Sequence, residues 1–167
     1  NIGGAIDLMP YFLGPFIGQN QYAYEYFHQG QYSPFKTQTG FLPTLVRFKK
    51  VVILIDGNSQ STAELMASVL KKYNVGVLVG TKTKGWGTIE RVFDLKQQID
   101  PAEKYSIYLV HTLTLRDDNK PGEGNCVEPT INITENDCQQ QLLTHFNYQP
   151  LVTAVADIWN RGLAEFN

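Results

Sequence analysis

The stretch VVILIDGNSQSTAELMASVLKKYNVGVLVG, residues 51–80, decides the fold of this 167-residue chain. Its first five residues are apolar and β-branched or Leu, which is typical of a strand buried on both faces. The turn signal Asp56-Gly57-Asn58 follows, and apolar residues in 61–73 then recur at the spacing of one helix face. A second apolar run, 75–79, ends at a glycine. This order of strand, turn, helix and strand predicts a βαβ unit in an α/β fold.

The sequence on either side of this unit contains further elements and no internal repeat. Tyr22, Tyr24 and Tyr26 alternate as on one face of a strand, although a loop rich in Gln and Tyr would have the same composition. Residues 1–18 are apolar, but their prolines limit any helix to a few turns. Two more strands and then two helices are expected at 88–95, 105–116, 138–146 and 150–166.

Composition and charge exclude several classes of protein. Hydrophobic residues make up 43% and charged residues 18% of the chain, which excludes a disordered chain. The net charge is −2 and the densest basic cluster is only Arg47 to Lys50, so we expect no nucleic-acid partner. No apolar stretch approaches the roughly 20 residues of a membrane span. Because the chain begins at Asn1 rather than Met, we expect it to be a processed or truncated piece.

The cysteines and histidines are too scattered for a metal site, and we expect neither a metal nor a cofactor. The three histidines, His28, His111 and His145, lie far apart in the sequence, and there is no CxxC. Cys126 and Cys138 are either two free thiols or a disulfide that closes a short loop. We expect the disulfide, which would indicate an oxidising compartment.

A serine lies at the turn between the first strand and the helix of the βαβ unit. At such a turn the hydroxyl of a nucleophilic serine is exposed beside the helix N-terminus, where free backbone N–H groups stabilise an oxyanion. Ser and Thr are also the preferred helix N-caps, and residues 56–64 alone favour that structural interpretation.

Four motifs together resemble the tail-specific, or C-terminal-processing, serine protease family. Residues 51–87 are similar to the family's strand, its SASASE or SAAE motif, its helix and its GxKTxGxG loop. Glu64 matches the family's Glu, which follows the nucleophile by three positions and so places the nucleophile on Ser61. Asn1-Ile2-Gly3-Gly4 resembles the end of the family's DLRxNxGG motif, and residues 122–133 resemble its EGxGVxPDIxV motif.

The resemblance implies a fold, a reaction and a location. The fold would be a crotonase- or ClpP-like, mostly parallel sheet with flanking helices. Residues 1–167 would be the C-terminal part of the catalytic domain, without its upstream part or any PDZ module. The chain would be a serine endopeptidase that hydrolyses protein or peptide substrates through an acyl-enzyme on Ser61. Gly3, Gly4 and Thr62 would form the oxyanion hole, and the protein would be periplasmic or secreted.

One position departs from the family pattern. Trp86 occupies the place of the lysine general base, and an indole cannot accept the serine proton. In the tricorn-like branch, which uses Ser, His and Glu, Glu123 would support a histidine that comes from upstream of Asn1. A displaced Ser59–Lys84 dyad would keep the family's spacing but needs two shifts in the alignment, so we rank it lower. In the tricorn-like interpretation Trp86 lines the substrate cleft, and the chain alone has almost no catalytic activity.

Two other classes of function stay open. A catalytically inactive relative would bind peptides or apolar ligands in the same cleft, which the aromatic stretch 10–35 would line. A structural subunit would pair through its strand edges, and a homo-oligomer is an open question. His111, on the apolar face of a predicted strand, is expected in the core or lining a cleft, and the other two histidines are expected at the surface.

Overall fold

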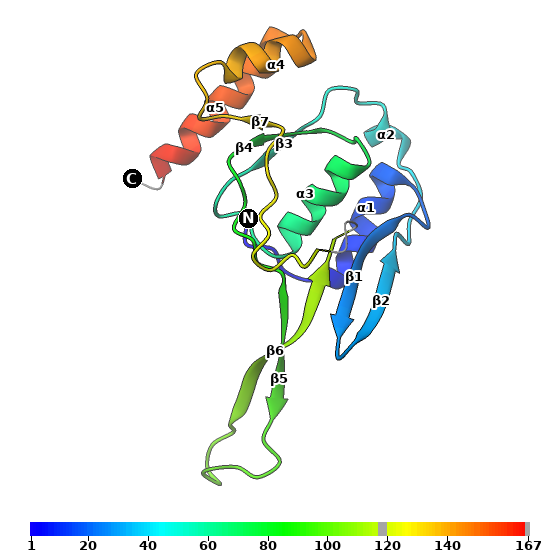
Figure 1. Ribbon diagram of the computed structural model, residues 1–167, viewed down its shortest axis with the longest axis vertical. Helices are drawn as coiled ribbons and strands as arrows, with labels where there is room; N and C mark the ends of the chain where they lie inside the picture. Colours follow the sequence, from blue (N-terminus) through cyan, green and yellow to red (C-terminus); the bar gives the residue numbers. More distant parts are fainter. Residues whose placement is uncertain (117–119, 166–167) are drawn as a thin grey trace.

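The predicted βαβ unit forms the centre of the computed structural model, which describes residues 1–116 and 120–165 (Figure 1). Strand β3 (Val52–Ile55), helix α3 (Thr62–Lys72) and strand β4 (Val77–Gly80) follow one another, and β3 and β4 pair in parallel. Strand β7 (Ile131–Asn132) adds to β4, also in parallel, so the order in this sheet is β3-β4-β7. Side chains of successive β4 residues alternate between its two faces.

Helices cover both faces of the parallel sheet. On one face Leu78 and Ile55 pack against Ala67 of α3. On the other face Val79 packs against α4 (Cys138–Phe146) and α5 (Gln149–Glu165) through Leu142 and Val155. A short turn, η1 (Ile6–Leu8), leads into α1 (Met9–Ile17), which packs against α3. The α/β class, the parallel sheet and its flanking helices are therefore confirmed.

A second sheet, entirely antiparallel, lies beside the first in the order β2-β1-β6-β5. Its strands are β1 (Tyr22–His28), β2 (Gln31–Lys36), β5 (Thr88–Asp94) and β6 (Ser106–Leu115), and the one-turn helix α2 (Pro43–Val46) follows β2. The tyrosine alternation thus belongs to a strand rather than a loop. Strands β5 and β6 extend beyond the other two as a projecting hairpin (Figure 1).

Burial differs from the sequence expectation in two strands. Leu54 of β3 is 36% exposed, because β3 is an edge strand of its sheet. In β6 only the inner half is buried, and Tyr108 and Val110 in the projecting half are exposed. Within the described residues, no helix is long and apolar enough to cross a membrane.

The expected Cys126–Cys138 disulfide is wrong, because both residues are free thiols. Cys126 lies in the loop before β7, where its Sγ faces Gly85. Cys138 begins α4 and packs against the apolar cluster around Val79. Although the two cysteines are close in the sequence, their side chains lie in different surroundings.

Candidate active site

Ser61 lies at the turn between β3 and α3, as predicted, and is the N-cap residue of the helix. Its backbone has φ 57° and ψ −131°, a region that residues other than glycine rarely adopt. Such a conformation costs on the order of 1–3 kcal/mol and persists only where surrounding contacts enforce it. A strained turn from a strand into a helix is also how hydrolases of another fold expose a serine nucleophile.

The N-terminal segment, residues 1–4, is tied to this turn by three contacts. Gln60 N–H donates to Asn1 O at 3.0 Å, and Thr62 Oγ1 donates to Gly4 O at 3.0 Å. Gly3 packs so closely that a Cβ there would lie 2.9 Å from both Gln60 O and Thr62 N. With φ +83°, Gly3 also adopts a backbone conformation that favours glycine. Gly3 therefore brings its backbone directly against the Ser61 turn.

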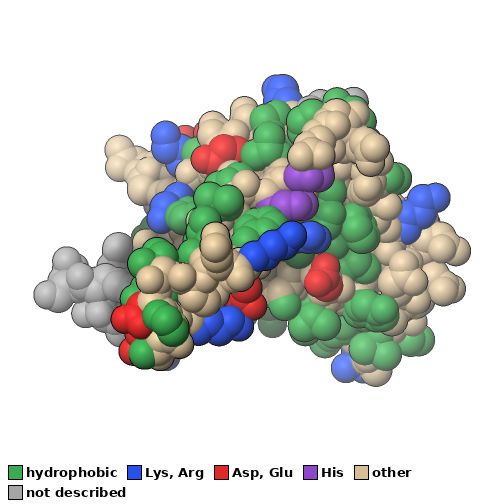
Figure 2. Space-filling view, turned by 90° about the horizontal axis from the view of Figure 1, so that it is seen from below, with side chains coloured by type: hydrophobic (Ala, Val, Ile, Leu, Met, Phe, Trp, Pro, Cys, Tyr) green, Lys and Arg blue, Asp and Glu red, His purple; other side chains and the backbone are tan. Residues whose placement is uncertain are grey.

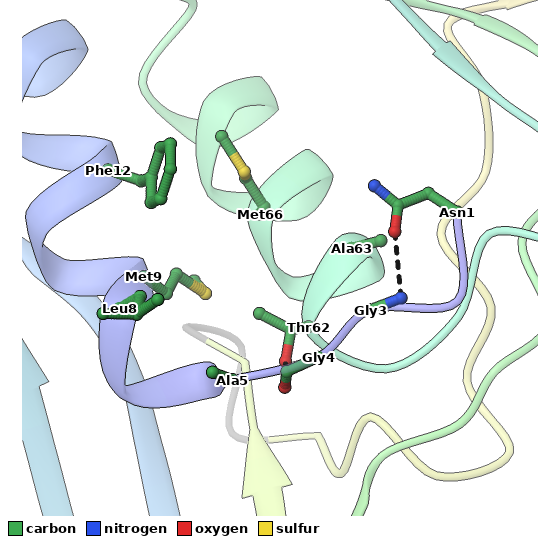
Figure 3. Close-up of a pocket in the computed structure, with 10 residues that line it drawn as sticks. All are labelled: Asn1, Gly3, Gly4, Ala5, Leu8, Met9, Phe12, Thr62, Ala63 and Met66. Carbon is green, nitrogen blue, oxygen red and sulfur yellow. Dashed lines mark hydrogen bonds between the residues drawn. The ribbon is translucent and has the colours of Figure 1, made fainter.

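The three residues expected in the oxyanion hole differ in what their N–H groups do. Gly3 N–H already donates to Asn1 Oδ1 at 3.0 Å (Figure 3). The N–H groups of Gly4 and Thr62 donate to no partner within the part of the chain that the structure describes. Thr62 begins α3, so its N–H is one of the first-turn donors that a helix leaves unpaired. Gly4 and Thr62 thus offer two donors in the cavity that Ser61 also lines.

Glu64 connects the Ser61 turn to the glycine-rich loop, residues 80–88. Its buried carboxylate, 5% exposed, accepts hydrogen bonds from four donors. One is the Ser61 N–H, at 2.9 Å. The other three are the Thr83 hydroxyl, Gly85 N–H at 2.6 Å and Trp86 N–H at 2.8 Å. A Glu three residues after a Ser N-cap is a capping signal that the sequence itself contains, at Ser61 and Glu64.

Trp86 lies on this loop with its indole 42% exposed. Its Nε1–H donates to Glu90 Oε1 at 3.3 Å, and the Lys84 ammonium lies 5.3 Å from the ring centroid. The lone pair of an indole nitrogen belongs to the aromatic ring, so Trp86 can donate its Nε1–H but cannot accept the serine proton.

The residues of the displaced dyad, Ser59 and Lys84, have other partners. Ser59 is 7% exposed, and its hydroxyl donates to Asp56 Oδ1 at 3.0 Å and accepts Asp56 N–H at 3.1 Å. Lys84 N–H donates to Ser59 O at 3.0 Å, but the Lys84 ammonium lies over Trp86. The structure brings the two backbones together and gives the two side chains different partners.

Glu123 lies next to the glycine-rich loop. Its Oε2 accepts the Gly87 N–H at 2.9 Å. Gly87 approaches so closely that a Cβ there would lie 2.0 Å from Glu123 N. The Glu123 side chain is exposed, and it is therefore held in place on one side and open to solvent on another.

Two cavities adjoin the Ser61 turn and share Gly4 and Thr62 in their linings. The first, about 180 Å³, is polar and contains Ser61 with Trp86 and Glu90. The described residues that line it include no lysine or histidine. The second, about 230 Å³, is apolar. No group of three potential metal ligands occurs in residues 1–116 and 120–165.

Two histidines stack elsewhere, on the antiparallel sheet. The ring centroids of His28 and His111 are 3.9 Å apart, and the rings are nearly parallel. Figure 2 shows two histidine side chains side by side on one face of the molecule. Loss of solvent around the ring, with smaller contributions from His28 and Arg91, lowers the pKa of His111. Neither histidine lines the two cavities at Ser61. His145 is exposed on α4, as expected.

Solved structures with this fold include three proteins of low sequence identity. A photosystem II D1 C-terminal processing protease aligns with a TM-score of 0.66 and 16% identity over 80% of this chain and 32% of its own. A lipoprotein from Streptococcus agalactiae aligns with a TM-score of 0.61 and 16% identity, over 88% of this chain and 51% of its own. A putative S41 protease from Bacteroides fragilis aligns with a TM-score of 0.59 and 20% identity, over 96% of this chain and 42% of its own.

The chain therefore spans about half the length of these proteins or less. A comparison with curated proteins finds no match. The model of one protein family matches residues 1–133, which include Gly3, Ser61, the glycine-rich loop and Glu123. This match covers most of the sequence, and on that basis the chain belongs to peptidase family S41.

Proposed function

We propose that this chain carries the nucleophile and oxyanion hole of a serine endopeptidase of the C-terminal-processing type. The observation that supports it is the strained Ser61 backbone, beside which the N–H groups of Gly4 and Thr62 have no partner among the described residues. In the reaction, Ser61 Oγ attacks a peptide carbonyl, and the two N–H groups hold the developing oxyanion. The amine leaves with a proton, and water then hydrolyses the ester on Ser61.

We propose that the general base is a histidine from a segment outside residues 1–167, as in the tricorn-like branch. Trp86 cannot serve, and no histidine or lysine is among the described residues that line the cavity at Ser61. The Glu90 carboxylate also lines this cavity, but its Oε1 already accepts hydrogen bonds from the Trp86 indole and the Thr88 hydroxyl. Glu123 would support the imidazolium that forms when this histidine takes the Ser61 proton. Its position beside Gly87, next to Trp86, supports this role, because its outer side is open to a further segment.

The substrate and location follow from the same proposal. The substrates would be proteins or peptides, bound along the cavities that meet at Ser61. We propose a periplasmic or secreted location on the family resemblance alone, since the expected disulfide is absent.

The test compares two serines two positions apart in the intact protein. Ser61→Ala is expected to abolish peptide hydrolysis and labelling by a fluorophosphonate probe, measured by mass spectrometry of the labelled peptide. Ser59→Ala is the matched control and is expected to leave labelling largely intact, because its hydroxyl is bonded to Asp56. The 167-residue chain alone should hydrolyse peptides very slowly, because it lacks the general base. The opposite result for the two variants would contradict the proposal and favour the Ser59–Lys84 dyad.

A further inference from the structure

The end of the molecule opposite Ser61 is formed by residues 41–50, FLPTLVRFKK, and by the C-terminal end of α3. Residues 41–50 contain α2 and lead towards the start of β3, whereas Ser61 lies beyond the end of β3. Figure 1 shows α2 beside the C-terminal end of α3, while the chain's N-terminus lies near the beginning of this helix. The 11 residues of α3 separate its two ends by roughly 16 Å.

This end of the molecule presents contiguous apolar side chains to solvent. The exposed fractions are 62% for Phe41, 45% for Leu42, 36% for Val46 and 56% for Phe48. Phe41, Val46 and Phe48 line one cavity of about 280 Å³, together with Tyr73 at the end of α3. Single apolar residues scattered over a surface need no explanation, but a contiguous exposed group marks a site of interaction.

The charged side chains of the same segment are all basic. Residues 26–55 contain four Lys and Arg residues and no Asp or Glu, although the whole chain has a net charge of −2. Arg47, Lys49 and Lys50 form no ion pair within the part of the chain that the structure describes. Arg47 and Lys50 lie instead over aromatic rings, 5.1 Å and 4.7 Å from the centroids. No carboxylate therefore neutralises these three charges from within the described residues.

A second cavity continues this surface towards α4. It has a volume of about 220 Å³ and shares Lys49 and Asn74 with the first cavity. His145 and Phe146 of α4 also line it. Among the described residues that line the two cavities, none is Asp or Glu, and Lys49 alone is Lys or Arg. An anionic group that enters either cavity would meet a basic side chain and no carboxylate of the lining.

We propose that residues 41–50 and the adjoining end of α3 dock onto a membrane that contains anionic lipids. Exposed Phe and Leu beside Lys and Arg are the combination by which peripheral proteins bind the headgroup region of a bilayer. Phe41 and Phe48 insert between headgroups and acyl chains, and the three basic side chains contact lipid phosphates. Ser61, at the other end of α3, then lies away from the bilayer.

The small extent of this surface favours a membrane over an acidic protein. A stable protein interface takes about 20–30 residues on each side, whereas the exposed apolar and basic residues here belong to one short segment. A bilayer needs no fitted partner surface, because apolar side chains enter it individually. The cavity at Phe41 shares no residue with the two cavities at Ser61, so this inference does not rest on the proposed function.

The test measures binding of the chain to lipid vesicles by flotation. Vesicles of phosphatidylcholine alone are compared with vesicles in which about a third of the lipid is anionic phosphatidylglycerol. Each basic side chain near an anionic surface strengthens binding by about fivefold, so the anionic vesicles are expected to bind at least about tenfold more tightly at low salt. NaCl at about 0.5 M should remove most of this difference by screening. Equal binding to both kinds of vesicle, or binding to neither, would overturn the proposal.

Two double variants with the same change in net charge locate the basic contribution. Lys49→Gln with Lys50→Gln is expected to weaken binding to the anionic vesicles by at least about tenfold. Lys96→Gln with Lys104→Gln, between β5 and β6, is the matched control and should change binding by less than about twofold. Urea unfolding of both variants checks that the fold is retained. An equal or larger effect of the second variant would overturn the location.

The apolar contribution separates a membrane from an acidic protein. Phe41→Ala is expected to weaken binding to the anionic vesicles by about tenfold, because the inserted ring is lost. Ile99→Ala is the matched control, since Ile99 is 77% exposed in the loop between β5 and β6, and should have no effect. Poly-glutamate, a soluble polyanion without a bilayer, should bind at least about tenfold more weakly than the vesicles. Poly-glutamate binding as tight as vesicle binding, and unchanged in Phe41→Ala, would indicate an acidic protein partner and overturn the proposal.

Discussion

The Ser61 turn and the projecting β5–β6 hairpin each contain a carboxylate with several partners, but in opposite surroundings. Glu64 is buried and accepts four hydrogen bonds, three of them from backbone N–H groups. Asp94 on the hairpin is 58% exposed and pairs with Lys104, 71% exposed, at 2.8 Å. A buried carboxylate that satisfies backbone donors fixes several segments at once, whereas an exposed pair competes with water and salt.

The same contrast extends to the apolar residues of the two regions. Around the turn, Leu65 and Ala67 of α3 are buried in packed clusters. On the hairpin, Val92, Tyr108 and Val110 are more than 60% exposed. A two-stranded ribbon has too little core to hold a fixed geometry by itself. Buried packing therefore fixes the backbone geometry of the Ser61 turn more firmly than that of the hairpin.

The largest expected effect is on Glu64. Glu64→Ala would leave the N–H groups of Ser61, Gly85 and Trp86 without their acceptor, since they bond to it at 2.6–2.9 Å. Because each buried unpaired donor costs about 1–3 kcal/mol, we expect a loss of at least about 3 kcal/mol in unfolding free energy, measured with urea. Glu64→Gln keeps the volume but loses one acceptor oxygen and should lie between wild type and Ala. A loss of unfolding free energy below about 1 kcal/mol for Glu64→Ala would contradict the idea that Glu64 holds the Ser61 turn and the glycine-rich loop together.

Glu123 tests whether exposure alone separates the two kinds of carboxylate, because it is exposed like Asp94 yet lies in the candidate site. In the intact protein, Glu123→Gln is expected to lower kcat by at least about tenfold and leave KM nearly unchanged, since Glu123 would act on the charged imidazolium of the transition state. Unfolding free energy should change by less than about 0.5 kcal/mol, as for other surface substitutions. Peptide hydrolysis by the variant at the wild-type rate would refute the tricorn-like assignment.

The sequence predicts the βαβ unit well because its signals are local. The apolar runs and the turn at Asp56 to Asn58 place every end of β3, α3 and β4 within two residues of where the structure has it. Ser61 is found at the predicted turn for the same reason. Periodicity and turn chemistry depend on neighbouring residues alone, so no knowledge of the rest of the chain is required.

Contacts between distant residues could not be predicted in this way. The packing of Gly3 on Gln60 and Thr62 joins segments almost 60 residues apart, and only a family resemblance pointed to it. The β1–β6 pairing that stacks His28 on His111 has no signal in either strand. The Cys126–Cys138 prediction failed for a related reason, because closeness in sequence says nothing about the direction of the side chains.

Substitution of His111 is expected to change stability by an intermediate amount that depends on pH. Because the pKa of His111 is lowered in the folded chain, the unfolded chain binds the proton more readily. This contribution to stability is complete above the unfolded pKa of about 6.5 and is lost as the pH falls below it. We expect the urea midpoint to decrease between about pH 8 and pH 5.5, and to decrease less in His111→Phe. The same pH dependence in both proteins would argue against the stacked pair as its source.

The smallest expected effect is on the hairpin carboxylate. Hydrogen bonds from Lys104 and Ser106 lower the pKa of Asp94, so its contribution to stability is present at neutral pH and is lost as the pH falls through the folded pKa. Both partners of the ion pair are exposed, and salt screens such pairs. Asp94→Asn at pH 7 is therefore expected to leave the urea midpoint unchanged within error, at low and at high salt. A decrease as large as that of Glu64→Ala would mean that the hairpin supports the fold, and the distinction between the two regions would fail.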